Sequence, residues 1–302
     1  MTFLTVLLTL FVERFVQRQR PQREHRWFDH YCRRLAGIPF TQWVMTRRWG
    51  AVAIVLPPVL LIAWLQTLFN GLSSLSGLIF GFVILLYSLG PRELGTQVES
   101  FLTERDRGNE GPANSLADEL CPGGAPDTEP QRSYAVASAL VVAACTRLVA
   151  PIFWFVVFGA VGAAAYRIIQ LLGARLQCAG CPDEMQAYSD EMRHIADWAP
   201  ARVTAAGYAI AGNFDAVAQA WQTFDYVPDT GPIDAAERLL AKTGLAALDT
   251  YPNEAEALDG ELAVMDAGLL PPVVEDALAL VWRSLAVWLA VLAAGSLVAA
   301  LA

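Results

Sequence analysis

The chain has 302 residues, of which 55% are hydrophobic and 17% charged, and its mean hydropathy is +0.39. Soluble domains carry about 25% charged residues, so this composition is typical of a membrane protein. The net charge of −9 argues against a nucleic-acid partner, because phosphate binding requires a basic face. We therefore expect an all-α, multi-pass integral membrane protein that has the lipid bilayer, and no nucleic acid, among its partners.

The first 48 residues combine a short apolar run with an arginine-rich segment. The run "MTFLTVLLTLFV" is shorter than the roughly 20 residues needed to cross a bilayer, and Glu13 follows it directly. Between positions 14 and 48 there are nine arginines and two acidic residues. Because cytoplasmic loops of membrane proteins are enriched in arginine and lysine, we expect residues 14–48 to be cytoplasmic.

Changes in composition divide the chain into six segments. These are a short apolar segment with an Arg-rich cytoplasmic part (1–48), a transmembrane hairpin (49–91), a polar loop (92–132), membrane and re-entrant helices (133–213), an acidic soluble helical region (214–276) and a C-terminal transmembrane helix (277–302). The hairpin contains two apolar runs, Trp49–Phe69 and Leu72–Leu89, with a turn expected at Asn70-Gly71.

The apolar stretch from Ser133 to Leu171 is too long for one membrane helix. Arg147 and Pro151 divide it, so we expect a half-buried helix over 133–147 and a span over 150–170.

The next helix is expected to begin at Pro200, because proline is tolerated in the first turn of a helix. The run that follows, Val203–Gly212, is apolar for only ten residues. A run of that length suits a re-entrant helix better than a full span.

Small residues at four-residue spacing predict that two helices pack closely. Gly159 and Ala163 form one such pair, and alanines 201, 205 and 209 form a second series. If the two helices pack together, Tyr166 and Arg167 approach Asp197 and Arg202. An unpaired arginine near the membrane centre costs about 2.5–3.5 kcal/mol. We therefore expect Arg202 to have an acidic partner, with Asp197 the nearest, or an anionic ligand.

Two other charged residues have alternative interpretations. Glu13 pairs with Arg14 or Arg202, or else marks the end of an apolar helix. Arg147 lines the same site or extends to the membrane surface. The candidate ligand-binding residues are thus Arg202, Arg167, Tyr166, Asp197, Glu13 and Arg147. The sequence identifies no catalytic residue.

We expect no metal centre. Cys178 and Cys181 form a close pair without further ligands at short spacing. Asp190, His194 and Asp197 share one face of a helix, but a solvated face explains that pattern better than a metal site does.

The blocks "GAVGAAAYR" and "DWAPARVTAAGYAIAG" resemble the AmpE family, inner-membrane regulatory proteins linked to β-lactamase induction. The order of elements is similar over nearly the whole length, from the short apolar start to the closing span. The resemblance implies a multi-pass protein of the bacterial inner membrane that modulates signalling in the β-lactam response. Its partner would be a small anionic ligand or another membrane protein, which the arginines could bind.

The same blocks are similar to those of the cobinamide-phosphate synthase (CobD/CbiB) family, so an amide-forming ligase or nucleotide-dependent transferase is the alternative. In that family a paired Asp-Asp precedes Pro-Ala-Arg, and Asn-Thr-x-Asp-Ser follows Tyr-Arg. Here Ala196 precedes Asp197, and "IIQLLGARLQ" follows Arg167. Because such a ligase needs carboxylates to hold Mg²⁺ beside ATP, we favour a pocket with altered or absent activity. ATP and Mg²⁺ are cofactors only if ligase-like activity is retained.

Overall fold

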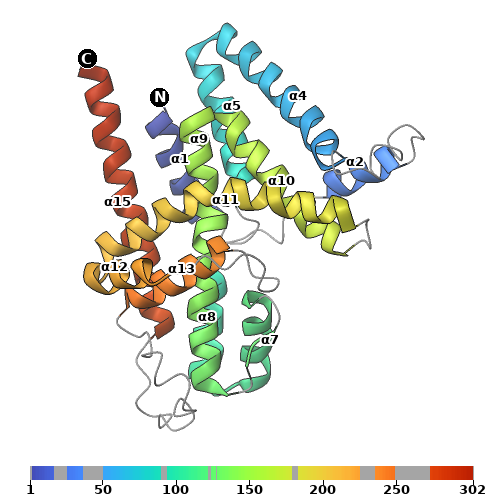
Figure 1. Ribbon diagram of the computed structural model, residues 1–302. Helices are drawn as coiled ribbons and strands as arrows, with labels where there is room; N and C mark the ends of the chain where they lie inside the picture. The colour runs from blue at the N-terminus through green and yellow to red at the C-terminus, as the bar shows by residue number, and fades with distance from the viewer. Residues whose placement is uncertain are drawn as a thin grey trace. The chain divides into compact units, whose positions relative to one another are not determined.

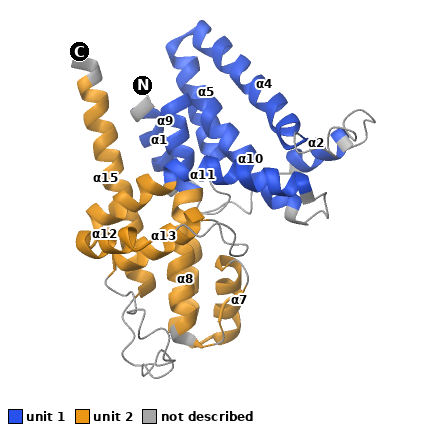
Figure 2. Cartoon of the chain, viewed as in Figure 1, with its two compact units in different colours: residues 1–91, 147–200 blue, residues 92–146, 201–302 orange. Residues whose placement is uncertain are grey.

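The computed structural model describes residues 2–16, 26–36, 50–89, 94–121, 124–126, 128–178, 183–224, 235–248 and 273–301 (Figure 1). Its described residues form helices and turns, with no strand among them, so the all-α prediction is confirmed. Two compact units are each assembled from two stretches of chain (Figure 2). Unit 1 contains residues 1–91 and 147–200, and unit 2 contains residues 92–146 and 201–302.

Unit 1 is built around α10 (Ala160–Cys178). Its other helices are α1 (Thr2–Val16), α2 (Arg26–Ala36), α4 (Gly50–Leu72), α5 (Ser74–Ser88), α9 (Ala150–Phe158) and most of α11 (Asp183–Ala211). Helix α10 packs against α4, α5 and α9, and α1 packs against α5. A hydrophobic core joins α2, α4 and α10, with Phe28, Ile54 and Leu172 buried in it.

Unit 2 is built around α8 (Glu129–Ala144), which packs against α13 (Ala235–Ala246) and α15 (Val273–Leu301). Its other helices are α6 (Leu94–Asp106), α7 (Glu110–Leu120), α12 (Phe214–Gln222) and the end of α11. Leu140, Leu240 and Leu280 are almost fully buried in it. The part of the acidic region that the structure describes is therefore helical.

Three of the described helical stretches are long and apolar enough to cross a membrane. They are Gly50–Leu72, Gln131–Phe158 and Val273–Val298, so the protein is an all-α membrane protein as predicted. Helix α5 has 15 residues, which corresponds to about 22 Å at 1.5 Å per residue. It is therefore shorter than the predicted second arm of the hairpin, Leu72–Leu89.

The hairpin turns at Ser73, so the prediction of a turn at Asn70-Gly71 was wrong. Ser73 is the N-cap of α5, and its hydroxyl accepts a hydrogen bond from the Ser76 backbone N–H at 3.1 Å. The Ser76 hydroxyl accepts one from the Ser73 backbone N–H at 3.1 Å. This reciprocal capping box satisfies two backbone donors at once and fixes the start of α5 at Ser74.

The helix after residue 128 changes near Arg147 and Pro151, as predicted, but the span predicted over 150–170 was wrong, because α9 ends at Gly159. A five-residue π-helical turn, η2 (Cys145–Val149), connects α8 to α9. Pro151 follows this turn in the first turn of α9. It has no N–H that could donate to the carbonyl of Arg147. Gly159 has a φ of +68°, a conformation that favours glycine, and there α9 ends.

Pro200 lies inside α11 rather than at its start, so the prediction of a separate helix beginning there was wrong. Proline leaves the carbonyl four residues earlier without its helical donor, here that of Ala196. The indole N–H of Trp154 donates to that carbonyl oxygen at 3.0 Å. A side chain from α9 thus replaces the missing backbone donor, and α11 continues as one helix.

Pro58 and Tyr31 repeat this arrangement. Pro58 deprives the carbonyl of Ile54 of its helical donor, and the Tyr31 hydroxyl of α2 donates to that oxygen at 3.0 Å. In unit 2, the hydroxyl of Tyr208 donates to the carbonyl of Val141 at 2.7 Å, just before α8 passes into η2. Aromatic donors from neighbouring helices therefore satisfy backbone acceptors near each of these irregularities.

Trp154→Phe is expected to lower the free energy of unfolding by about 1–3 kcal/mol, because it leaves a buried carbonyl without a donor. Pro200→Ala supplies an alternative donor, the N–H of residue 200, so the same change should cost less in that background. Thermal unfolding in detergent of the two single variants and the double variant measures this coupling.

Trp64→Phe is the matched control, since Trp64 is 61% exposed on α4. This change should lower the free energy of unfolding only slightly. If Trp154→Phe lowers the free energy of unfolding equally with and without Pro200, Trp154 does not replace the donor that the proline removes.

Candidate functional site

The predicted approach of Tyr166 to Asp197 is found within unit 1. The Tyr166 hydroxyl donates to Oδ1 of Asp197 at 2.7 Å. Gln170, one turn after Tyr166 on α10, donates through Nε2 to Oδ1 and Oδ2 of Asp197 at 3.1 and 3.0 Å, and to the Tyr166 hydroxyl at 3.0 Å. The three side chains form one hydrogen-bonded network, in which the sequence interpretation had missed Gln170.

This network lies in apolar surroundings. Tyr166 is 1% exposed and Asp197 is 5% exposed. Ala150 and Ala196 are buried against Tyr166, and Trp154 packs beside them. A buried carboxylate is costly unless it is well hydrogen-bonded, so Tyr166 and Gln170 stabilise Asp197 in this position. The bond from Trp154 to the Ala196 carbonyl fixes the neighbouring turn of α11.

Arg167 differs from Asp197 in its surroundings. Its Nε atom is buried, and among the described residues the side chain has no hydrogen-bond partner at Nε and no ion pair. Burial lowers the pKa of the guanidinium, whereas Tyr166 and Tyr87 act in the opposite direction. An arginine in such a position favours an anion, because a bound negative charge offsets the cost of desolvation.

The other candidate residues lie elsewhere in the chain. Arg202 is half-buried in the part of α11 that belongs to unit 2, and burial lowers its pKa. Its pairing with Asp197 stays a prediction. Arg147 is half-buried in η2. Glu13 belongs to α1, and its side chain lies outside the described residues, so its pairing also stays a prediction.

The described residues contain no group of three or more His, Cys, Asp or Glu side chains placed to hold a metal ion. Asp190 is exposed and lies 3.7 Å from the Arg193 guanidinium, whereas Asp197 is buried against Tyr166. Cys181 and the side chain of Cys178 lie outside the described residues.

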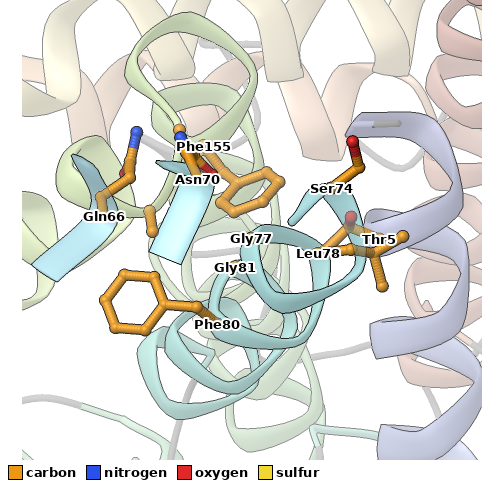
Figure 3. Close-up of a pocket in the computed structure, with 11 residues that line it drawn as sticks. Thr5, Gln66, Asn70, Ser74, Gly77, Leu78, Phe80, Gly81 and Phe155 are labelled. Carbon is orange, nitrogen blue, oxygen red and sulfur yellow. The ribbon is translucent and has the colours of Figure 1, made fainter. Parts of the chain in front are cut away.

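Unit 1 also contains a cavity of about 340 Å³ that the sequence interpretation missed (Figure 3). Polar and apolar side chains line it without a charged one: Thr5, Gln66, Asn70, Ser74, Gly77, Leu78, Phe80, Gly81, Phe155, Gly159 and Ala160. This lining suits an uncharged polar group rather than an anion. Gln66, a polar residue within an apolar run, was the one signal of it.

Gln66 has a structural role as well. Its Oε1 accepts a hydrogen bond from the backbone N–H of Val161 at 3.1 Å. That N–H lies in the first turn of α10, where helix donors have no partner within the helix. Gln66 of α4 therefore caps the helix that starts after the break at Gly159.

Tyr166→Phe is expected to cost about 1.5–3 kcal/mol of unfolding free energy, the usual value for a hydrogen bond to a charged group. In an Asp197→Asn background the cost should be smaller, because the charged acceptor is gone. Chemical or thermal unfolding in detergent gives the coupling energy.

Tyr208→Phe serves as the control, since its hydrogen bond to Val141 shares no group with Asp197. Its cost should be the same in both backgrounds. Additive costs of Tyr166→Phe and Asp197→Asn would show that the two side chains are not energetically coupled.

Comparison with known proteins identifies the family of the chain. The family described as "Regulatory signalling modulator protein AmpE" matches residues 1–229. The chain is also 28% identical over 251 residues to "Cobalamin biosynthesis protein CobD" of Stutzerimonas stutzeri (strain A1501), covering 79% of this chain and 78% of that protein. No solved structure matches the chain. Because the family match extends over three quarters of the sequence, the chain belongs to the AmpE family of regulatory signalling modulators.

Proposed function

We propose that this protein is a signalling modulator of the bacterial inner membrane that acts in the β-lactam response and binds a small anion through Arg167. Family membership supports the regulatory role. One structural observation supports the ligand: the buried Nε of Arg167 has no hydrogen-bond partner among the residues that the structure describes. A buried guanidinium without a counter-charge is unfavourable, and an anion that binds there removes part of that cost.

Asp197 is proposed to position the site rather than to neutralise Arg167. Its carboxylate accepts hydrogen bonds from Tyr166 and Gln170, both on the same helix as Arg167. These bonds fix α10 against the turn of α11 that carries Asp197. Arg202 is proposed as a second cation for the ligand. A membrane protein with an acidic segment is the alternative partner, because a carboxylate from another chain would supply the same charge.

The first test is Arg167→Gln in a strain that lacks its own copy of the protein. Loss of the guanidinium should remove the response of β-lactamase expression to a β-lactam, because the binding charge is lost. Arg167→Lys should retain part of the response. Reporter expression measured against inducer concentration distinguishes the variants, with protein levels checked by immunoblot.

Arg107→Gln is the control, since Arg107 is exposed and pairs with Glu104 at 2.7 Å. It should respond as the wild type does. A normal response from Arg167→Gln, expressed at the wild-type level, would contradict the proposed role of Arg167.

The second candidate function is an amide-forming ligase or nucleotide-dependent transferase, which the similarity to a cobalamin biosynthesis protein supports. Such chemistry requires carboxylates for Mg²⁺ and cations for phosphate. Arg167 and Arg202 would supply the cations. Asp197 would supply a carboxylate, although it accepts hydrogen bonds from Tyr166 and Gln170.

Purified protein with ATP and Mg²⁺ tests this alternative directly. If the signalling proposal is right, nucleotide turnover stays at the level of the buffer control. Turnover that Arg202→Ala abolishes and Arg107→Gln leaves intact would instead establish an enzyme.

A further inference from the structure

Helix α2 has one apolar face, which unit 1 covers, and one cationic face, which it leaves exposed. Phe28 and Cys32 are 2% and 6% exposed, and they pack in a core with residues of α4 and α10. His30, Arg33 and Arg34 on the same helix are exposed. This division of faces is typical of a helix that lies in the plane of a membrane surface.

Two contacts place α2 beside the same end of the hairpin. The hydroxyl of Tyr31 donates to the carbonyl of Ile54, four residues after the start of α4. The indole N–H of Trp27 donates to the hydroxyl of Tyr87, one residue before the end of α5. The base of the hairpin is where its apolar helices meet the headgroup region, and Trp and Tyr are enriched at that depth. Both contacts suit a helix that lies at headgroup depth.

The exposed face of α2 carries positive charge that no described acidic side chain offsets. Asp29, its one acidic residue, pairs with the Arg175 guanidinium of α10. Arg33 donates through Nε to the backbone carbonyl of Asp29 at 3.3 Å, and that neutral acceptor does not offset its charge. Among the described residues, no ion pair is found for Arg33 or Arg34.

We propose that this exposed face, formed by Arg33 and Arg34, binds the phosphate of anionic phospholipids in the leaflet where the hairpin begins and ends. Guanidinium groups match phosphate oxygens in both charge and geometry. Lipid is the occupant because the two arginines lie at headgroup depth beside a membrane span, within a segment of nine arginines and two acidic residues between positions 14 and 48. The binding does not depend on the function proposed for Arg167.

The test measures lipid binding to the full-length protein in neutral detergent. Phosphatidylglycerol and phosphatidylcholine with identical acyl chains are titrated, and bound lipid is counted by native mass spectrometry. The wild type should prefer phosphatidylglycerol. Arg33→Gln and Arg34→Gln should each weaken its binding about fivefold, the factor that corresponds to about 1 kcal/mol per arginine at a membrane surface. Neither change should alter phosphatidylcholine binding.

Two further variants separate charge from structure. Arg33→Lys keeps the charge and should retain most of the preference, whereas Arg107→Gln removes an exposed arginine of unit 2 and should have no effect. Equal affinity of the wild type for both lipids would overturn the proposal, as would unchanged binding by both glutamine variants. Full competition by glycerol 3-phosphate at matched concentration would also overturn it, since the site would then recognise a free phosphate rather than a lipid.

Discussion

Unit 1 depends on the replacement of hydrogen-bond donors that Pro58 and Pro200 remove from its helices. The backbone carbonyl four residues before each of these prolines needs a donor from outside its own helix. Lipid offers no hydrogen bonds, so the donor has to come from the protein. For Pro200 it is the Trp154 indole, and for Pro58 it is the Tyr31 hydroxyl. Each bond joins two helices at one defined position. Apolar packing alone would allow the helices to slide more freely.

The position of the candidate site follows from the first of these bonds. Trp154 holds Ala196, and the next residue along α11 is Asp197, which accepts from Tyr166 and Gln170 of α10. The result is a buried polar network surrounded by alanine and tryptophan. Arg167, adjacent to Tyr166 in the chain, has a buried Nε for which the described part of the chain provides no hydrogen-bond partner. The carboxylate of Asp197 is therefore hydrogen-bonded, whereas no counter-charge for Arg167 is found among the residues that the structure describes.

Local signals in the sequence were sufficient for the helical class, for the spans at Gly50–Leu72 and Val273–Val298 and for the approach of Tyr166 to Asp197. Hydrophobic length acts over a few turns of helix. The small-residue packing through which that approach was expected stays a prediction, because alanines 201, 205 and 209 belong to unit 2. The continuation of α11 through Pro200 could not be predicted in this way, because it depends on Trp154, 46 positions earlier in the chain. Gln170 and the cavity beside Gln66 were missed for a similar reason, since both depend on packing between helices.

Position 159 accepts few residues other than glycine. Its φ of +68° suits glycine, and a Cβ atom there would lie 3.0 Å from Nε2 of Gln66. The same Gln66 caps the helix that starts after the bend. Any replacement at 159 would therefore meet backbone strain and crowd the amide that holds the next helix. A side chain at position 159 would thus disturb two features at once, the turn after α9 and the first turn of α10.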